Sequence, residues 1–177
     1  MSRSVLLLRA VNVGGRNPVP MPRLREVLAS ETDLVDVATY IASGNIICDE
    51  PADAVASCAR VREVIAAEFG VDTPVIARTH EELEVSLAAQ PFGGGAEKLV
   101  HAMFLEGEPA GEGVVALEGR LVPGERIALV VRDLWISYSE RGVEATKLTK
   151  AALDKALGVA GTARNLRTVR TLVELTA

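Results

Sequence analysis

The order of the apolar runs along the chain is the feature that most restricts its fold. Residues 4–78 contain a strand-like run, a helical pattern, two strand-like runs joined by a tight turn, a long helical pattern and a last strand-like run. The expected elements are Ser4–Val11, Pro20–Ser30, Val35–Ala42, Ile46–Asp49, Pro51–Phe69 and Val75–Arg78. This β-α-β-β-α-β order predicts a ferredoxin-like half with one antiparallel sheet.

Two local signals support the turns of this half. The sequence Ser43-Gly44-Asn45 is a hairpin signal between two strands. Gly70 follows the long helix at the position where a left-handed C-cap is expected. A further helix, Thr79–Ala89, begins with Thr79 and Glu82 in the spacing of a capping box.

The second half repeats the order of elements, although not the residues. It follows a glycine-rich linker, PFGGGAEK, at residues 91–98. Strands are expected at Leu99–Leu105, Ile127–Val131, Leu134–Tyr138 and Val159–Arg164, and helices at Pro109–Leu117, Thr146–Leu157 and from Asn165 onward. The sequence thus predicts an α+β protein of two tandem ferredoxin-like halves, at 1–78 and 99–177, joined by a helix and linker at 79–98.

Composition excludes several classes of function. Aromatic residues make up only 3% of the 177 residues and the net charge is −5, which disfavours base stacking and general affinity for nucleic acid. The chain has no apolar run of about 20 residues and no signal-peptide pattern, so we expect a cytoplasmic protein without a membrane span. Two cysteines, Cys48 and Cys58, and two histidines, His80 and His101, show no ligand spacing, so no metal site is expected.

Positive charge gathers at both ends of this acidic chain. Residues 1–25 contain five arginines and no acid, and residues 143–177 contain six basic residues against three acids. If the two ends met, they would form a local positive patch suited to a small anion. Lys147 and Lys150, and likewise Arg167 and Arg170, are three residues apart near predicted helix starts, where the helix dipole disfavours cations. A bound anion would offset that cost.

The segment VGGRN, residues 13–17, lies between a strand and a helix but matches neither the Walker loop nor the GxGxxG pattern. Its backbone N–H groups could accept an anion, whereas Pro18, Pro20 and Pro22 remove donors nearby. The structural alternative is a corner that needs positive φ at glycine. The structural alternative for Asn45 is a turn residue, for Asn165 the N-cap of the last helix, and for Thr146 and Thr149 a helix cap.

No catalytic group stands out in the sequence. Asp36, Glu140 and Glu144 are possible general bases, but no spacing selects one of them. Ser43 lacks the G-x-S-x-G pattern of a nucleophile elbow. Whether the protein is an enzyme therefore stays open, and the sequence indicates no cofactor.

Four segments, LRAVNVGGRNPVPM, TYIASGNIIC, TKLTKAALDKALG and TARNLRTVRTL, together resemble the bacterial family known as domain of unknown function 1697, over essentially the whole chain. The resemblance implies a tandem ferredoxin-like protein and no established activity. The family pattern, roughly LRGINVGGKN, YIQSGNVVF, SKLTN and TARNW, differs here at Ala42, where the family has Gln, and at Leu166, where it has Trp. The absence of the Gln side chain and the Trp ring at these two positions argues against recognition of a nucleobase.

These observations predict binding of a small anion, a nucleotide or another phosphorylated ligand, at a basic site between the two halves. The residues expected there are Arg9, Asn12, Gly14, Gly15, Arg16, Asn17, Ser43, Asn45, Lys147, Thr149, Arg164 and Asn165. Arginine and lysine would supply charge, and asparagine would orient the ligand. An enzyme acting on phosphorylated substrates, a nucleic-acid-binding module and a structural or interaction protein are the open alternatives. The sequence specifies no oligomeric state.

Overall fold

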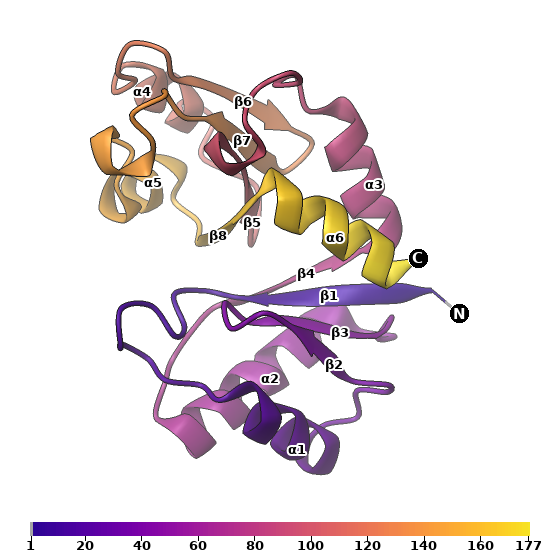
Figure 1. The fold of residues 1–177 in the computed structure, drawn as a ribbon. Helices are drawn as coiled ribbons and strands as arrows, with labels where there is room; N and C mark the ends of the chain where they lie inside the picture. The colour runs from indigo at the N-terminus through magenta and orange to yellow at the C-terminus, as the bar shows by residue number, and fades with distance from the viewer. Residues whose placement is uncertain (1) are drawn as a thin grey trace. The chain divides into compact units, whose positions relative to one another are not determined.

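The computed structural model describes residues 2–177, which form two compact units (Figure 1). Unit 1 contains the chain up to Leu83 together with Leu172–Ala177, and unit 2 is Glu84–Thr171. No helix among the described residues combines the length and apolar character needed to cross a membrane.

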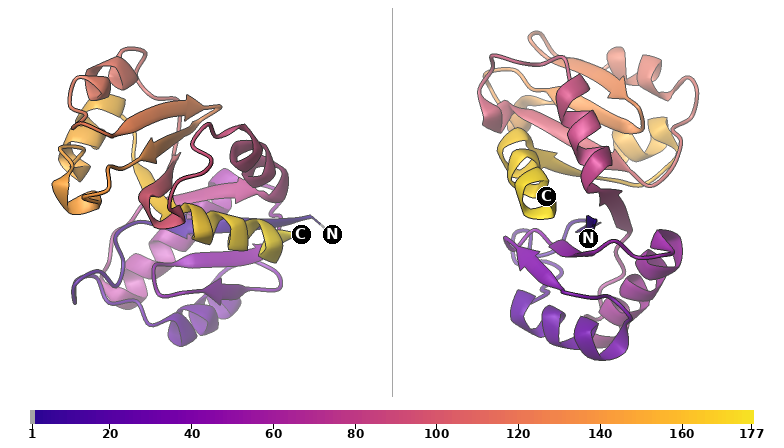
Figure 2. Two further views of the ribbon diagram at one scale, coloured as in Figure 1. Left: turned by 45° about the horizontal axis from the view of Figure 1, so that its top comes forward. Right: turned by 90° about the vertical axis from the view of Figure 1, so that its right-hand side faces the viewer.

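Unit 1 is a four-stranded antiparallel sheet with two helices. Its elements are β1 (Arg3–Leu8), α1 (Met21–Glu31), β2 (Ala38–Tyr40), β3 (Asn45–Asp49), α2 (Ala54–Phe69) and β4 (Val75–Thr79). The strands lie in the order β2-β3-β1-β4, and each neighbouring pair is antiparallel. Both helices cover the same face of the sheet (Figures 1 and 2). Leu6 and Leu8 alternate along β1 toward this face and pack in one core with Leu24, Leu28 and Ile65 of the helices.

Unit 2 repeats this topology with its own core. Its elements are η1 (Glu97–Leu99), β5 (Val100–Leu105), α4 (Gly113–Glu118), β6 (Arg126–Val130), β7 (Asp133–Ser137), η2 (Val143–Ala145), α5 (Lys150–Leu157) and β8 (Gly161–Asn165). The strand order is β6-β7-β5-β8, again antiparallel throughout. Two further helices, α3 (His80–Ala89) and α6 (Leu166–Thr176), complete the chain. The predicted pair of ferredoxin-like halves is confirmed.

Predicted helix caps account for several boundaries. The amide of Glu82 donates to Thr79 Oγ1 at 3.1 Å, and the amide of Thr79 donates to Glu82 Oε2 at 2.9 Å, which is the predicted capping box. Gly70 ends α2 in the left-handed conformation, at φ 66°. Local chemistry therefore sets where these helices start and stop.

Five predicted elements had a boundary wrong by three or more residues: β1 ends at Leu8 and not at Val11, α2 begins at Ala54 and not at Pro51, and β2, α4 and α5 are also shorter than predicted. Helix α4 begins at Gly113 rather than Pro109, and α5 begins at Lys150 rather than Thr146, because Thr149 is its N-cap and accepts from the amide of Ala152. Strand β2 covers only Ala38–Tyr40 of the predicted Val35–Ala42. Gly113 also has a packing role that periodicity does not show: a Cβ there would lie 2.3 Å from the carbonyl oxygen of Ala156 on α5.

Candidate functional site

The glycine segment that follows β1 is a miniature hairpin. The amide of Asn12 donates to Asn17 O at 3.0 Å, and the amide of Arg16 donates to Val13 O at 2.9 Å. Gly14 and Gly15, at the tip, both have positive φ, 56° and 75°, as a type I′ turn requires. Residues 13–17 are all exposed. The segment is therefore a corner with positive φ at both glycines, and its tip is exposed to solvent.

Asn12 fixes the base of this hairpin. Its Nδ2 donates to Val19 O at 2.9 Å and to Ala42 O at 2.7 Å, and its Oδ1 accepts from the amide of Val19 at 2.8 Å. Asn17 closes the loop with a bond from Nδ2 to Ala10 O at 2.9 Å. Asn12 and Asn17 both adopt positive φ, which asparagine tolerates better than most residues.

The turn between β2 and β3 lies directly against the end of β1. The amide of Leu8 donates to Gly44 O at 2.9 Å, and a Cβ on Gly44 would lie 2.8 Å from the Cβ of Leu8. Asn45 is fully buried, and its Nδ2 donates to Tyr40 O at 2.9 Å and to Ser43 Oγ at 3.3 Å. Together with the Asn12–Ala42 bond, these contacts bring the first two family segments together within unit 1.

The two arginines of the first segment have different surroundings. The backbone of Arg9 is tied to Thr73, whose hydroxyl accepts from Arg9 N at 3.0 Å and donates to Arg9 O at 2.7 Å. The exposed guanidinium of Arg16 has no ion pair and no side-chain hydrogen bond with any residue from 2 to 177. By contrast, Arg23 contacts Glu68 at 2.6 Å, and Arg62 contacts Asp72 at 2.6 Å.

In unit 2 the predicted site residues are divided between the surface and the interior. Lys147 is exposed but precedes α5, so the expectation that it shares a helical surface with Lys150 was wrong. Arg164 on β8 is buried, and its Nη1 donates to Thr162 Oγ1 at 2.8 Å and to Ala163 O at 2.9 Å. Burial lowers the pKa of this guanidinium to about 10, so it stays charged at neutral pH.

The start of α6 is stabilised from within the chain. Asn165 Oδ1 accepts from the amide of Thr168 at 2.9 Å, which is an N-cap contact. Arg170 forms an ion pair with Glu97, so its charge is already matched, whereas Arg167 is exposed. Two of the four family segments thus lie in unit 1 and two in unit 2, and the predicted shared site stays a prediction.

Two features of this region were missed in the sequence. Nothing in the sequence selects Thr73, 64 positions from Arg9, as the residue that holds its backbone. The bond from Asn12 to the β2–β3 turn was equally hidden, since it depends on the strands being paired. Within residues 2–177 no three His, Cys, Asp or Glu side chains gather closely enough to hold a metal ion.

The fold and these segments define a class of protein: two tandem ferredoxin-like units with polar loops at the strand ends. A conserved bacterial protein from Streptococcus pneumoniae has a similar solved structure, with a TM-score of 0.79, 22% sequence identity and 99% of each chain covered. The chain belongs to the family described as protein of unknown function (DUF1697), whose profile matches residues 1–135. No curated protein matches the sequence.

Proposed function

We propose that the protein binds a small phosphorylated ligand or nucleotide, and that the hairpin tip Gly14-Gly15-Arg16 contacts its anionic group. The observation that carries this proposal is the exposed Arg16 guanidinium, held on a fixed loop without a carboxylate partner in the described part of the chain. A guanidinium suits phosphate because its planar fork can donate two parallel hydrogen bonds.

The backbone of the hairpin tip supplies hydrogen-bond donors in addition to the Arg16 guanidinium. No backbone hydrogen bond within residues 2–177 uses the amides of Gly14 or Gly15, and both residues are exposed. Successive free amides in a turn form a concave surface that accepts anions. Because Asn12 and Asn17 hold the loop, little conformational freedom remains to be lost on binding.

The asparagines have a different role in this proposal from the one their sequence pattern suggests. Asn12 and Asn45 use their side-chain amides within unit 1, so they position the loop. In unit 2 the exposed Lys147 is the candidate cation, and Thr149 is occupied as a helix cap. We place this function in the cytoplasm, because the thiols Cys48 and Cys58 suit a reducing compartment.

The test is a titration of the ¹⁵N-labelled full chain with pyrophosphate and with ATP, followed by NMR. We expect the amide signals of Gly14 and Gly15 and the Arg16 Nε signal to move with saturation. Arg16→Gln should weaken binding about three- to fivefold, the range for one exposed charged contact. The internal control is Gly70, which is also left-handed but caps α2.

A matched control variant is Arg62→Gln, which removes the same charge from unit 1 at the Asp72 ion pair. Equal weakening by both variants would mean that only net charge matters, and it would refute a site at the tip. Tight binding of an oligonucleotide that falls steeply with added salt, without an effect of pyrophosphate, would favour the nucleic-acid alternative instead.

A further inference from the structure

A buried acidic residue, Glu125, lies in the turn that leads into β6 of unit 2. The amide of Glu125 donates to Val122 O at 3.0 Å, and the amide of Val122 donates to Glu125 Oε2 at 3.1 Å. Pro123 and Gly124, the latter at φ 90°, form the centre of this turn. The two hydrogen bonds hold the side chain in the turn, where Glu125 is only 6% exposed.

The second oxygen of this carboxylate is buried without a partner. Glu125 Oε1 is shielded from solvent and makes no hydrogen bond or ion pair with any residue from 2 to 177. Buried polar atoms nearly always have a hydrogen-bond partner, and an ionised group is the most costly to bury without one. Unit 2 therefore carries a negative charge in its interior that no side chain of the described residues balances.

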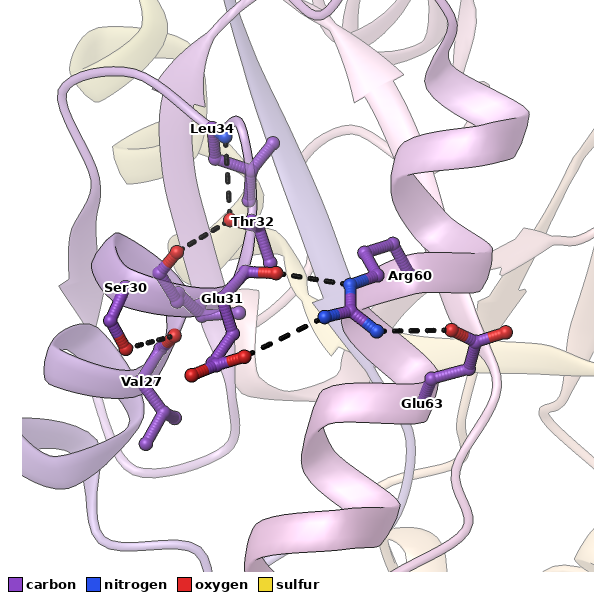
Figure 3. Close-up of polar contacts among 8 residues, drawn as sticks. Val27, Ser30, Glu31, Thr32, Leu34, Arg60 and Glu63 are labelled. Atoms are coloured by element: carbon purple, nitrogen blue, oxygen red, sulfur yellow. Dashed lines mark hydrogen bonds and ion pairs between the residues drawn. The ribbon is translucent and has the colours of Figure 1, made fainter.

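Carboxylates on the surface of unit 1 are better matched than this buried one. The Arg60 guanidinium donates from Nε to Glu31 O at 3.0 Å, and its Nη2 and Nη1 lie 3.7 Å and 3.3 Å from the carboxylates of Glu31 and Glu63 (Figure 3). Both acids are exposed, so water alone would solvate their charges. Glu125 Oε1 has neither solvent nor a cationic side chain beside it.

A second buried oxygen without a partner belongs to Ser139, which follows β7. A Cβ on Gly124 would lie 3.3 Å from the Cβ of Ser139, so Ser139 packs against the residue before Glu125. Ser139 is 8% exposed, and its Oγ makes no hydrogen bond with residues 2–177. A hydroxyl has two lone pairs to offer in addition to its hydrogen. Two side chains at the same end of the sheet thus lack a partner independently of each other.

Tyr138 lies close enough to Glu125 to be affected by its charge. Burial raises the pKa of Tyr138 to about 12, and the charge of Glu125 adds to the increase. The phenol is therefore neutral at physiological pH. The surroundings of Glu125 thus supply further oxygen atoms but no positive charge.

The charge and the kind of these groups select the class of ligand. Carboxylate and hydroxyl oxygens suit hard metal cations. One carboxylate balances one positive charge, and within residues 2–177 no three His, Cys, Asp or Glu side chains gather as a multivalent site requires. Because both unpartnered oxygens are shielded from solvent, the ligand must be small and must lose most of its hydration shell. A water molecule would supply hydrogen bonds but would leave the charge unbalanced.

We propose that Glu125 Oε1 and Ser139 Oγ hold a dehydrated alkali-metal cation, K⁺ or Na⁺, at this end of the unit 2 sheet. The ion balances the buried charge and links the turn before β6 to the residues that follow β7. Gly124 and Glu140, each one residue from the site, are exposed, so the ion enters by a short local opening. The site uses none of the residues of the anion-binding proposal and is independent of it.

The test is urea unfolding of the full chain in KCl, NaCl and choline chloride at equal ionic strength, followed by Trp135 fluorescence. Trp135 is the single tryptophan and lies in unit 2, as the proposed site does. A cation that binds only the folded state should raise the urea midpoint above its value in choline chloride. At concentrations above the dissociation constant, each tenfold increase in the cation should lower the unfolding equilibrium constant about tenfold.

Glu125→Gln removes the charge but keeps an oxygen for the Val122 amide, so it should abolish the difference between the salts. In choline chloride this variant should have a higher urea midpoint than the wild type, because it buries no unbalanced charge. Ser139→Ala should raise the cation concentration for half of the effect about two- to tenfold. The matched control is Glu118→Gln, which removes an exposed carboxylate of unit 2 without an ion pair to residues 2–177 and should behave like the wild type.

Equal urea midpoints of the wild type in all three salts would overturn the proposal, since an internal water molecule predicts that result. An equal difference between salts in the wild type and in Glu125→Gln would also overturn it, because the difference would then reflect a general effect of the salts on folding. An unchanged cation dependence in Ser139→Ala would refute the paired site as well.

Discussion

The sharpest prediction concerns Asn12, which the structure makes the main anchor of the glycine hairpin. Asn12→Ala removes three hydrogen bonds, to Val19 O, from Val19 N and to Ala42 O, at 2.7–2.9 Å. Val19 is fully buried, so its amide would be left without a partner. A buried donor left unpaired costs about 1–3 kcal/mol, and each lost hydrogen bond about 0.5–1.5 kcal/mol.

Asn17→Ala is the matched control for this change. Asn12 and Asn17 have φ of 54° and 50°, so alanine is strained to a similar degree, about 1 kcal/mol, at both positions. Asn17 makes a single exposed side-chain bond, to Ala10 O. The strain therefore cancels in the comparison, and N12A should lower the free energy of unfolding of unit 1 by about 2 kcal/mol more than N17A.

The assay must report on unit 1, and Trp135, the single tryptophan, lies in unit 2. Native-state hydrogen exchange of the β1 amides, followed by NMR, gives the required free energy. A difference of about 2 kcal/mol corresponds to exchange roughly 30-fold faster in N12A than in N17A. If the two variants exchanged at equal rates, the Asn12 contacts would not stabilise the loop, and the reasoning from their geometry would be wrong.

Three further predictions concern unit 2 and the core of unit 1. Trp135 Nε1 donates to buried Ser86 Oγ at 3.0 Å, so Ser86→Ala should lower stability by about 1–3 kcal/mol and lower the urea midpoint of Trp fluorescence. Burial lowers the pKa of His101 below its usual 6.5, so the folded state favours the neutral ring. The free energy of unfolding should therefore fall as the pH drops below 6.5, and His101→Phe should remove this part of the pH dependence of the urea midpoint. Burial raises the pKa of the Cys48 thiol to about 11. In a Cys58→Ser background, a thiol reagent at pH 8 should therefore label Cys48 only when urea unfolds the protein. Fast labelling of Cys48 in the native protein would contradict this prediction.

The order of elements was predictable because it depends on local periodicity. The short, near-continuous apolar run of β1 and the long helical apolar pattern of α2 are each distinct enough to identify the element. The Thr79–Glu82 capping box could also be predicted, because both of its hydrogen bonds close within four residues.

The start of α5 was predicted too early, for a physical reason that the apolar periodicity of the sequence does not show. Residues 146–149 fit a helical pattern, but Thr149 lies in extended backbone at φ −70° and ψ 159° and caps the helix instead of entering it. A threonine that caps and a threonine inside a helix look alike in a pattern. What separates them here is the cap hydrogen bond, in which Thr149 Oγ1 accepts from the amide of Ala152 at 3.2 Å.

The roles of the polar family residues needed the tertiary structure. Asn12, Asn45 and Asn165 share the composition of a ligand-binding set, but their partners are Val19 and Ala42, Tyr40 and Ser43, and Thr168. Only strand pairing places Ala42 beside Asn12, 30 positions away. The sequence could identify these residues as special, but it could not separate groups that hold a loop from groups that face a ligand.

The distinction between residues that hold the loop and residues that could face a ligand decides which variants can report on function. Removing Asn12 or Asn45 would disturb the loop, so lost ligand binding in those variants would be equally consistent with a structural role. Arg16 contacts no side chain that its loss would leave unpaired, and its backbone bond to Val13 survives any substitution except proline. Arg16→Gln should therefore leave the exchange rates of β1 unchanged while it weakens anion binding. A variant that lowered both would show that Arg16, too, is part of the fold and not of the site.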